Sequence, residues 1–305
     1  MVDVAAYQQS PRVSVLVNCF NGEKYLAEAI ESVISQTYVD WELIFWDNQS
    51  TDRSSEILNS YVDSRIKYFR SDKHTSLGEA RVESLKRATG SYIAIIDADD
   101  VWMHDKLEHQ IRFMESNSDV VLLGAWAKRI NEFSVEIGEL TGPEKNAEVI
   151  QRLGTNNPFV NSTVLFDRNA ASSIGGYNSD FRSSQDYDLW IRLSEVGRLH
   201  ILPKFLSKVR IHSRQLSSRR ISIDISRDGF LLLKKARTIL PLDKKTLKEN
   251  HDELSRFGVL YGMALVSNGK VLIGIWKIFV GILRSPGAFL KPRNLLKVKR
   301  YVLGR

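Results

Sequence analysis

The 305-residue sequence contains a single cysteine, Cys19, so it cannot form an intrachain disulfide. That residue lies in an apolar run, where a small buried side chain is typical, and the pattern fits a reducing compartment. Long apolar runs are also lacking. A membrane-spanning helix needs about 20 apolar residues, and the best candidate, residues 271–283, is interrupted by Lys277. The first ten residues are polar and contain Asp3, so we expect no secretory signal and a cytoplasmic protein.

A glycine-rich phosphate loop is missing from the first 100 residues. This excludes a nucleotide site of the Walker or dinucleotide-binding type in that region. A nucleotide bound there would need its phosphates held by a metal ion instead. The hydrophobic content of 43% and charged content of 26% are ordinary for a globular protein.

Acidic residues are scarce in the C-terminal third of the chain. Residues 201–305 carry 23 lysines and arginines against six aspartates and glutamates, whereas residues 1–200 carry 20 against 30. A basic tail on an acidic body indicates an anionic partner for the tail. The segment VLIGIWKIFVGILRSP has bulky apolar residues between its charges, which favours an anionic membrane surface over nucleic acid. A packed helix with a solvated basic face is an equally good interpretation.

Strand-like and helix-like segments alternate along the first 130 residues. The β-branched run VSVLVNCF predicts a buried strand, and the segment after it places apolar residues on one helical stripe. We predict strands at 13–20, 41–47, 66–70, 91–97 and 120–127, and helices at 24–35, 53–62, 78–89 and 105–116. Strands separated by helices predict an α/β fold with a parallel, doubly wound sheet.

The rest of the chain is less regular. Turn signals such as Asn156-Asn157-Pro158 and Gly175-Gly176 interrupt residues 131–200. Within that section we predict a strand at 159–166 and a helix at 187–197. Beyond residue 220 the pattern is mostly helical and basic.

Three loops rich in aspartate and asparagine each follow an apolar strand, at 18–22, 47–52 and 97–100. In open α/β sheets, ligands bind at the carboxyl ends of the strands. These loops are therefore the predicted functional site.

The segment IIDADD (95–100) places several carboxylates at the end of a buried strand. Such carboxylates repel one another, so a divalent cation is expected to compensate them, and oxygen ligands favour Mg²⁺ or Mn²⁺. A metal there would neutralise a departing phosphate. In the alternative interpretation, Asp99 or Asp100 only caps a helix that follows Trp102.

The segment WDNQSTD (46–52) offers hydrogen-bond donors and acceptors suited to a base edge and to ribose hydroxyls. An Asx-turn with a capping box would use the same residues.

Four segments together resemble glycosyltransferase family 2, whose enzymes have the GT-A fold. They are VSVLVNCFNGEKYLAEAIESVISQTYVDWELIFWDNQSTD, ATGSYIAIIDADD, SSQDYDLWIRL and VRIHSRQLS, and they span residues 12–217 in the right order and spacing. The resemblance implies an inverting enzyme that uses a nucleotide sugar. No Gln-x-x-Arg-Trp element of processive synthases is present, so we expect one glycosidic bond per cycle.

The resemblance also implies a role for each matching position. The nucleotide-binding residues would be Asn18, Asn21, Asp47, Asn48, Arg81 and Asp97. The metal ligands would be Asp99, Asp97 and His212, with Asp99 in direct contact. The catalytic base would be Asp186, although this residue could equally serve as the N-cap of the helix that follows it.

Three positions depart from the family pattern. Asn18 stands where proline is usual, Asn48 replaces the second aspartate of the usual pair, and Gln185 replaces a glutamate before the base. The amide of Asn48 both donates and accepts, which leaves the identity of the nucleobase open.

The resemblance implies a GT-A glycosyltransferase domain at 1–215, with a nucleotide-sugar half (1–130) and an acceptor half (131–215), followed by a basic helical region at 216–305. We expect the acceptor to be a saccharide or a lipid-linked saccharide of cell-surface polysaccharide synthesis. The enzyme would be cytoplasmic and rest on the inner face of the cell membrane. A sugar-phosphate nucleotidyltransferase and a non-catalytic binder of carbohydrate or nucleic acid are the alternatives.

Overall fold

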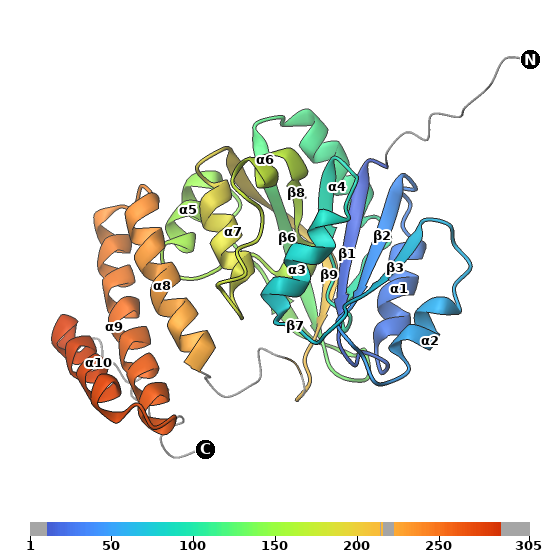
Figure 1. Cartoon of the computed structure of the whole chain (residues 1–305). Helices are drawn as coiled ribbons and strands as arrows, with labels where there is room; N and C mark the ends of the chain where they lie inside the picture. The colour runs from blue at the N-terminus through green and yellow to red at the C-terminus, as the bar shows by residue number, and fades with distance from the viewer. Residues whose placement is uncertain (1–10, 214, 216–222, 288–305) are drawn as a thin grey trace, which may run out of the picture.

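The computed structural model describes residues 11–213, 215 and 223–287. A β-sheet forms the centre of the molecule, helices cover both of its faces, and three further helices form a layer at one end (Figure 1). The strands are β1 (Val13–Cys19), β2 (Trp41–Asp47), β3 (Ile66–Arg70), β4 (Tyr92–Ile95), β5 (Val101–Trp102), β6 (Val120–Ile130), β7 (Glu136–Leu140), β8 (Leu165–Asp167) and β9 (Arg198–Arg210).

Helices connect most of these strands. They are α1 (Leu26–Ile34), α2 (Ser54–Asn59), α3 (Leu77–Lys86), α4 (Lys106–Ser116), α5 (Asn146–Leu153), α6 (Arg168–Ser173), α7 (Gln185–Leu193), α8 (Ile223–Ile239), α9 (Lys244–Ser267) and α10 (Val271–Arg284), with a short 3₁₀ helix, η1 (Asn161–Thr163).

The described strands form one sheet in the order β3-β2-β1-β4-β8-β6-β9-β5, with β7 paired to β6. Strands β3, β2, β1 and β4 are parallel, as the alternating pattern predicted. The prediction of a wholly parallel sheet is wrong, because β8 inserts between β4 and β6 and runs antiparallel to both. Strands β5 and β7 are also antiparallel to their neighbours. The fold is therefore a mixed α/β sheet.

The elements predicted in the first 130 residues are all present, with ends shifted by a few residues. The strand predicted at 159–166 is wrong in its first part, because residues 161–163 form η1 and only 165–167 pair in the sheet. The helix predicted at 187–197 begins earlier and ends at Leu193. The long strand β9 was not predicted, since its sequence mixes basic residues with a proline.

Two hydrophobic cores lie on the two faces of the sheet. Strand β1 sends Val13, Val15 and Val17 into one core together with α1 and α4. It sends Leu16 into the other core, which contains residues of α5, α7 and α8. This alternation is the period of two expected for a strand. Strands β1 and β2 and most of β4 are buried on both sides, so their carboxyl ends are the parts that remain available for a ligand.

The C-terminal region is helical where the structure describes it, as predicted. Helix α8 packs against α7 and α9, and α10 packs against α9 (Figure 1). None of the described helices is long and apolar enough to cross a lipid bilayer.

Candidate active site

The carboxyl ends of β1, β2 and β4 meet at one edge of the sheet, because β1 pairs in parallel with β2 on one side and β4 on the other. The loops after these strands contact one another. Oδ1 of Asn21 accepts a hydrogen bond of 2.8 Å from the amide of Thr51, and a Cβ placed on Gly22 would lie 3.5 Å from Cβ of Ala98. The three polar loops predicted from the sequence thus form one edge of the molecule.

Asp47 is fully buried at the end of β2. Its Oδ1 accepts a hydrogen bond of 2.7 Å from the amide of Ser50, and its Oδ2 accepts one of 2.8 Å from the hydroxyl of Tyr68. The first of these hydrogen bonds is the one expected for the Asx-turn that the alternative interpretation of WDNQSTD predicted. Asp47 therefore braces the loop, and its contact with a nucleotide stays a prediction.

The side chain of Asn48 also forms its hydrogen bonds within the protein. Its Nδ2 donates to the carbonyl of Thr75 at 2.8 Å, and its Oδ1 accepts from the amide and the hydroxyl of the same residue. The backbone oxygen of Asn48 also lies 3.0 Å from Nδ1 of His74. The His74 ring packs on Phe20 with centroids 4.2 Å apart, and Phe20 is 49% exposed. An exposed aromatic ring is thereby held next to the predicted nucleotide residues.

The two other asparagines at this edge have different positions. Asn18 donates from Nδ2 to the carbonyl of Ala80 at 3.1 Å and contacts the hydroxyl of Ser84, which ties β1 to α3. Asn21 adopts a positive φ of 55°, a conformation that asparagine tolerates better than most residues. Of the two, Asn21 is exposed and can face a ligand, while Asn18 is half-buried.

Asp97 lies where β4 ends and is held from two directions. Its Oδ1 accepts a hydrogen bond of 2.8 Å from Nδ2 of Asn161 and lies 3.5 Å from Nη2 of Arg81. Its backbone amide donates to the hydroxyl of Ser162 at 3.0 Å. Asn161 and Ser162 belong to η1, so the turn that replaces the predicted strand is what positions Asp97.

Asp99 faces His212, with Oδ2 and Nε2 2.9 Å apart. The backbone carbonyl of Asp99 accepts a hydrogen bond of 2.9 Å from Nε of Arg210, a fully buried side chain. Arg210 also forms an ion pair of 2.7 Å with Glu28. The end of β9 is thus fixed against the Asp-x-Asp loop, and this brings His212 to Asp99.

Asp100, the third aspartate of the motif, has a different function. Its Oδ2 accepts from the hydroxyl of Ser162, and its Oδ1 accepts from the amide of Arg210 at 2.9 Å. The helix after the motif begins at Lys106 with Asp105 at its N-cap. The interpretation of Asp99 or Asp100 as a helix cap is therefore wrong, and Asp100 instead joins η1 to β9.

Asp186 lies in the first turn of α7 and is half-buried. The N-cap of this helix is Ser184, so the interpretation of Asp186 as a cap is wrong. Oδ2 of Asp186 accepts a hydrogen bond of 3.0 Å from Nδ2 of Asn157. Burial raises the pKa of Tyr177, and the charges of Asp186 and Asp97 add to that rise. Burial opposes a rise in the pKa of Arg81, but the same two carboxylates contribute to raising it. The residues predicted as base and as nucleotide contacts thus belong to one charged cluster.

Negative charge accumulates in this cluster. Burial raises the pKa of Asp97 to about 6, with Arg81 opposing the rise and the charges of Asp99 and Asp186 adding to it. Burial and the same kind of repulsion raise the pKa of Asp100 well above its usual range. Asp97 still keeps 44% of its side chain accessible, so a ligand can reach it. A cluster with this excess of carboxylates favours the binding of a cation.

The donor atoms fit a divalent metal only in part. Among the residues that the structure describes, no three histidine, cysteine, aspartate or glutamate side chains come together closely enough to enclose a metal ion. Asp99 and His212 do face each other, whereas Asp97 turns toward Arg81 and Asn161. Mg²⁺ is often held by one or two carboxylates together with substrate phosphates. The pair therefore fits a metal whose remaining ligands come from a bound diphosphate.

Two cavities in the described chain lie away from this edge. One of about 510 Å³ lies between α4 and β9, and one of about 90 Å³ lies between α10 and its neighbours α8 and α9. The candidate active site is therefore identified by its charges and hydrogen bonds and not by cavity volume.

Two residues of the site, Asn157 and Arg210, were not singled out from the sequence. Asn161 and Tyr177 lie at 159–163 and 175–177, the part of the predicted acceptor half in which acceptor recognition was expected. Asn157 lies in a turn signal of the middle section, which marked the turn and not the side chain. The hydroxyl of Tyr177 is buried with no hydrogen-bond partner among the described residues. Arg210 is next but one to His212, and a fully buried arginine cannot be recognised from sequence alone.

Comparison with known proteins agrees with this arrangement. Residues 14–174 match the model of the family described as Glycosyl transferase family 2. A Bacillus subtilis (strain 168) protein named as a glycosyltransferase, EpsE, is 35% identical over 240 residues, which cover 76% of this chain and 84% of that protein. A second relative is the Escherichia coli protein named UDP-Glc:alpha-D-GlcNAc-diphosphoundecaprenol beta-1,3-glucosyltransferase WfgD. It is 30% identical over 210 residues, which cover 68% of this chain and 80% of that protein.

Solved structures share the fold. S. aureus TarS 1-349 in complex with UDP-GlcNAc has a TM-score of 0.68 at 18% identity, with 96% of this chain and 92% of that chain covered. The mannosyltransferase PcManGT from Pyrobaculum calidifontis in complex with GDP-Man and Mn²⁺ has a TM-score of 0.61 at 15% identity, with 98% and 89% covered. At these identities the likeness supports the GT-A fold alone.

Proposed function

The chain belongs to glycosyl transferase family 2, and from this premise we propose that it moves a sugar from a nucleoside-diphosphate sugar to a hydroxyl of a lipid-linked saccharide, with inversion at the anomeric carbon. As an enzyme that forms glycosidic bonds, it is neither a nucleotidyltransferase nor a non-catalytic binder. The observation that carries the proposal is the set of carboxylate contacts at the carboxyl edge of the sheet, where Asp97 lies 3.5 Å from Arg81 and Asp99 lies 2.9 Å from His212.

The donor would lie along the loops after β1, β2 and β4. Phe20 is exposed beside His74 and offers a face on which a base can stack. Asn21, Asp47 and Asn48 would border this position, and Asn18 would support it from β1. Arg81 and Asp97 then lie toward the sugar and the diphosphate, where the guanidinium would pair with a phosphate oxygen.

Asp186 would act as the general base. Its carboxylate takes the proton of the acceptor hydroxyl while that oxygen forms a bond to the anomeric carbon of the donor. The bond between that carbon and the diphosphate oxygen breaks, and the nucleoside diphosphate leaves with the electron pair. One displacement from the opposite face inverts the configuration. Asn157 would hold the base in position through its hydrogen bond to Oδ2.

Asp99 and His212 would hold a bound Mn²⁺ or Mg²⁺, with Asp97 nearby. Such a metal supplies positive charge that stabilises the departing diphosphate. Arg81 and the fixed backbone of the Asp-x-Asp loop would orient the same group from the protein side. Arg210 keeps that backbone in place through its bond to the carbonyl of Asp99.

The acceptor and the location follow from a relative and from charge. The Escherichia coli relative is named for an acceptor attached to diphosphoundecaprenol, and residues 201–305 of the present chain are strongly basic. We assign residues 1–215 to a catalytic domain, with donor and acceptor halves, and residues 216–305 to a basic helical region. This region would hold the enzyme on the inner face of the cell membrane, within reach of a lipid-linked acceptor.

The function can be tested with a panel of nucleotide sugars. Purified protein is incubated with each donor and Mn²⁺, Mg²⁺ or a chelator, and release of the nucleoside diphosphate is measured for wild type and Asp99→Ala. We expect slow, metal-dependent hydrolysis of one donor that is lost in the variant. Absence of both turnover and calorimetric binding for every donor would contradict the proposal.

The base is tested with the same donor and a saccharide acceptor. Asp186→Asn should lower the transfer rate by about 10²–10⁴-fold while donor binding persists. Asp180→Asn, an exposed aspartate on the preceding loop, is the matched control and should leave the rate unchanged. An active Asp186→Asn protein would refute the assignment of the base.

A further inference from the structure

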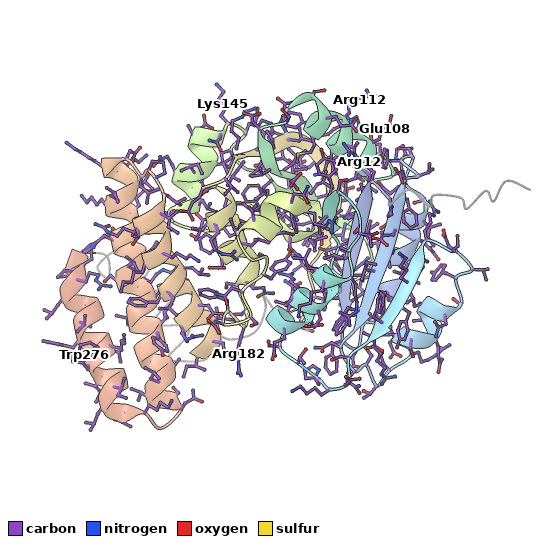
Figure 2. All side chains as sticks on the ribbon, turned by 45° about the horizontal axis from the view of Figure 1, so that its top comes forward. Arg12, Glu108, Arg112, Lys145, Arg182 and Trp276 are labelled. Carbon is purple, nitrogen blue, oxygen red and sulfur yellow. The ribbon has the colours of Figure 1, made fainter. Side chains whose placement is uncertain are left out.

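Helix α10 presents large apolar side chains to solvent. Leu272 is 84% exposed, Trp276 58% and Phe279 59%, and most other apolar residues of the helix are exposed as well. The buried residues of the helix are Gly274 and Gly281. Figure 2 shows Trp276 on the outermost helix of the molecule, at the far end from the central sheet. We call this surface the α10 face and define it by Leu272, Ile275, Trp276 and Phe279.

The contact between α10 and α9 explains why this face remains open. A Cβ on Gly262 would lie 2.7 Å from the carbonyl oxygen of Gly274, and a Cβ on Gly281 would lie 2.7 Å from Cγ2 of Val259. The hydroxyl of Ser255 also donates to the carbonyl of Gly281. The two helices therefore approach through glycines, and the bulky residues of α10 are left on its other side.

Positive charges lie along one edge of the α10 face. Lys277 and Arg284 are seven residues apart, which is close to two helical turns and places them on one side of α10. Lys277 and Arg284 line the cavity of about 90 Å³ together with Trp276 and Phe230. The α10 segment contains no acidic residue. An apolar face bordered by cations is typical of helices that lie in a membrane interface.

We propose that α10 lies flat in an anionic lipid surface, with the α10 face among the acyl chains and with Lys277 and Arg284 against lipid phosphates. Fourteen residues of helix extend about 21 Å, less than the roughly 30 Å of a hydrocarbon core, so the helix can lie in the surface but cannot span it. Lipid phosphates complement the cations, whereas a second copy of the chain would present the same positive charges. The inference rests on the proposed function only for its purpose, which is to bring the enzyme to a lipid-linked acceptor.

Vesicle flotation of the full-length protein tests this assignment. We expect wild type to float with phosphatidylcholine vesicles that contain phosphatidylglycerol, and about tenfold less with phosphatidylcholine alone. The double variant Leu272→Glu with Phe279→Glu should lower the floating fraction about tenfold, because charged side chains do not enter the acyl region. Val62→Glu, which alters a fully exposed apolar residue elsewhere, should float like wild type.

Fluorescence gives an independent readout of depth. The emission of wild type minus that of Trp276→Phe isolates Trp276, and this difference should shift to the blue when anionic vesicles are added. In the free protein acrylamide should quench the same signal strongly, since the ring is exposed. Weak quenching would mean that another part of the chain covers the face, and it would overturn the proposal.

Two further outcomes would also overturn it. One is the absence of vesicle binding by wild type, and the other is a dimer in analytical ultracentrifugation that Leu272→Glu dissociates. Hydrolysis of the donor in solution is measured in parallel. Loss of vesicle binding with hydrolysis intact locates the defect in α10, whereas vesicle binding without any donor turnover would count against the proposed function alone.

Discussion

Nζ of Lys235 on α8 lies 2.6 Å from Oδ1 of Asp188 on α7, and Asp188 is fully buried. The other oxygen of Asp188 accepts from Arg192, which also donates to the carbonyls of Ile174 and Gly176. Asp188 lies in the same helical turn as Asp186. The first C-terminal helix thus holds the helix that carries the proposed base.

Lys235→Met should lower the free energy of unfolding by about 1–3 kcal/mol, because a buried carboxylate loses a charged hydrogen-bond donor. Urea denaturation checks this. Lys248→Met, at an exposed lysine of α9, should change stability by less than about 0.5 kcal/mol. Equal stability of the two variants would mean that the ion pair contributes nothing to the junction of α7 and α8.

Asn157→Ala should lower kcat about tenfold and leave the KM of the donor unchanged. The variant removes the hydrogen bond of 3.0 Å to Asp186, and a bond to a charged group contributes about 1.5–3 kcal/mol. Steady-state kinetics with saturating acceptor checks this. Asn156→Ala, at the exposed neighbour, is the control. A rise in the donor KM at constant kcat would show that Asn157 binds the donor and does not position the base.

Tyr68→Phe should weaken donor binding. The variant removes the hydrogen bond to Oδ2 of Asp47 and leaves a buried carboxylate with fewer partners. We expect a loss of about 1–3 kcal/mol in stability and a rise in the donor KM that exceeds the fall in kcat. Thermal unfolding and initial rates measure the two effects. Tyr61→Phe, whose hydroxyl lies at 3.2 Å from the carboxylate of Glu31, should be nearly neutral.

Glu42→Gln should reduce the dependence of stability on acid pH. Burial alone would raise the pKa of Glu42, but hydrogen bonds from Lys67, Ser14 and Thr89 outweigh it and lower the pKa below the usual value of 4.5. The charged carboxylate therefore stabilises the fold above the unfolded pKa, and this contribution is lost as the pH falls through the folded pKa.

Urea midpoints at about pH 7 and about pH 3 measure this effect. Wild type should lose more stability over this interval than Glu42→Gln does. Glu249→Gln, an exposed glutamate of α9, should follow wild type. A wild-type loss no greater than that of Glu42→Gln would show that the carboxylate contributes no acid-sensitive stability.

Much of residues 1–130 was predictable because their structure depends on local pattern. The alternation of strands and helices predicted β1 to β4 and the edge at which their loops meet. The Asp-x-Asp loop follows directly from an apolar strand, so its position at that edge required no knowledge of distant residues. The contact between His212 and Asp99 has no such local signal and was expected only from the family resemblance. It forms because the end of β9 is bonded to the Asp-x-Asp loop through Arg210.

The middle section was less predictable because long-range pairing decides it. Residues 161–163 lie inside the run 159–166 that predicted a strand, but they form a turn in which Asn161 and Ser162 bond Asp97. Strand β8 runs antiparallel to both β4 and β6. The direction of a strand within a sheet cannot be read from the periodicity of its own residues. The same holds for Asn157, which meets Asp186 across a separation of 29 residues.

By itself the sequence determined the alternating elements, the polar loops at the strand ends, the family resemblance and the basic charge of the tail, because each depends on the order of neighbouring residues. Only the tertiary structure decided which side of α10 packs on the protein and which side faces solvent. Glycines allow its backbone to approach α9 closely, so the side chains that composition alone would assign to a core face outward. Whether an apolar residue is buried depends on the surface opposite to it, and that surface comes from another part of the chain.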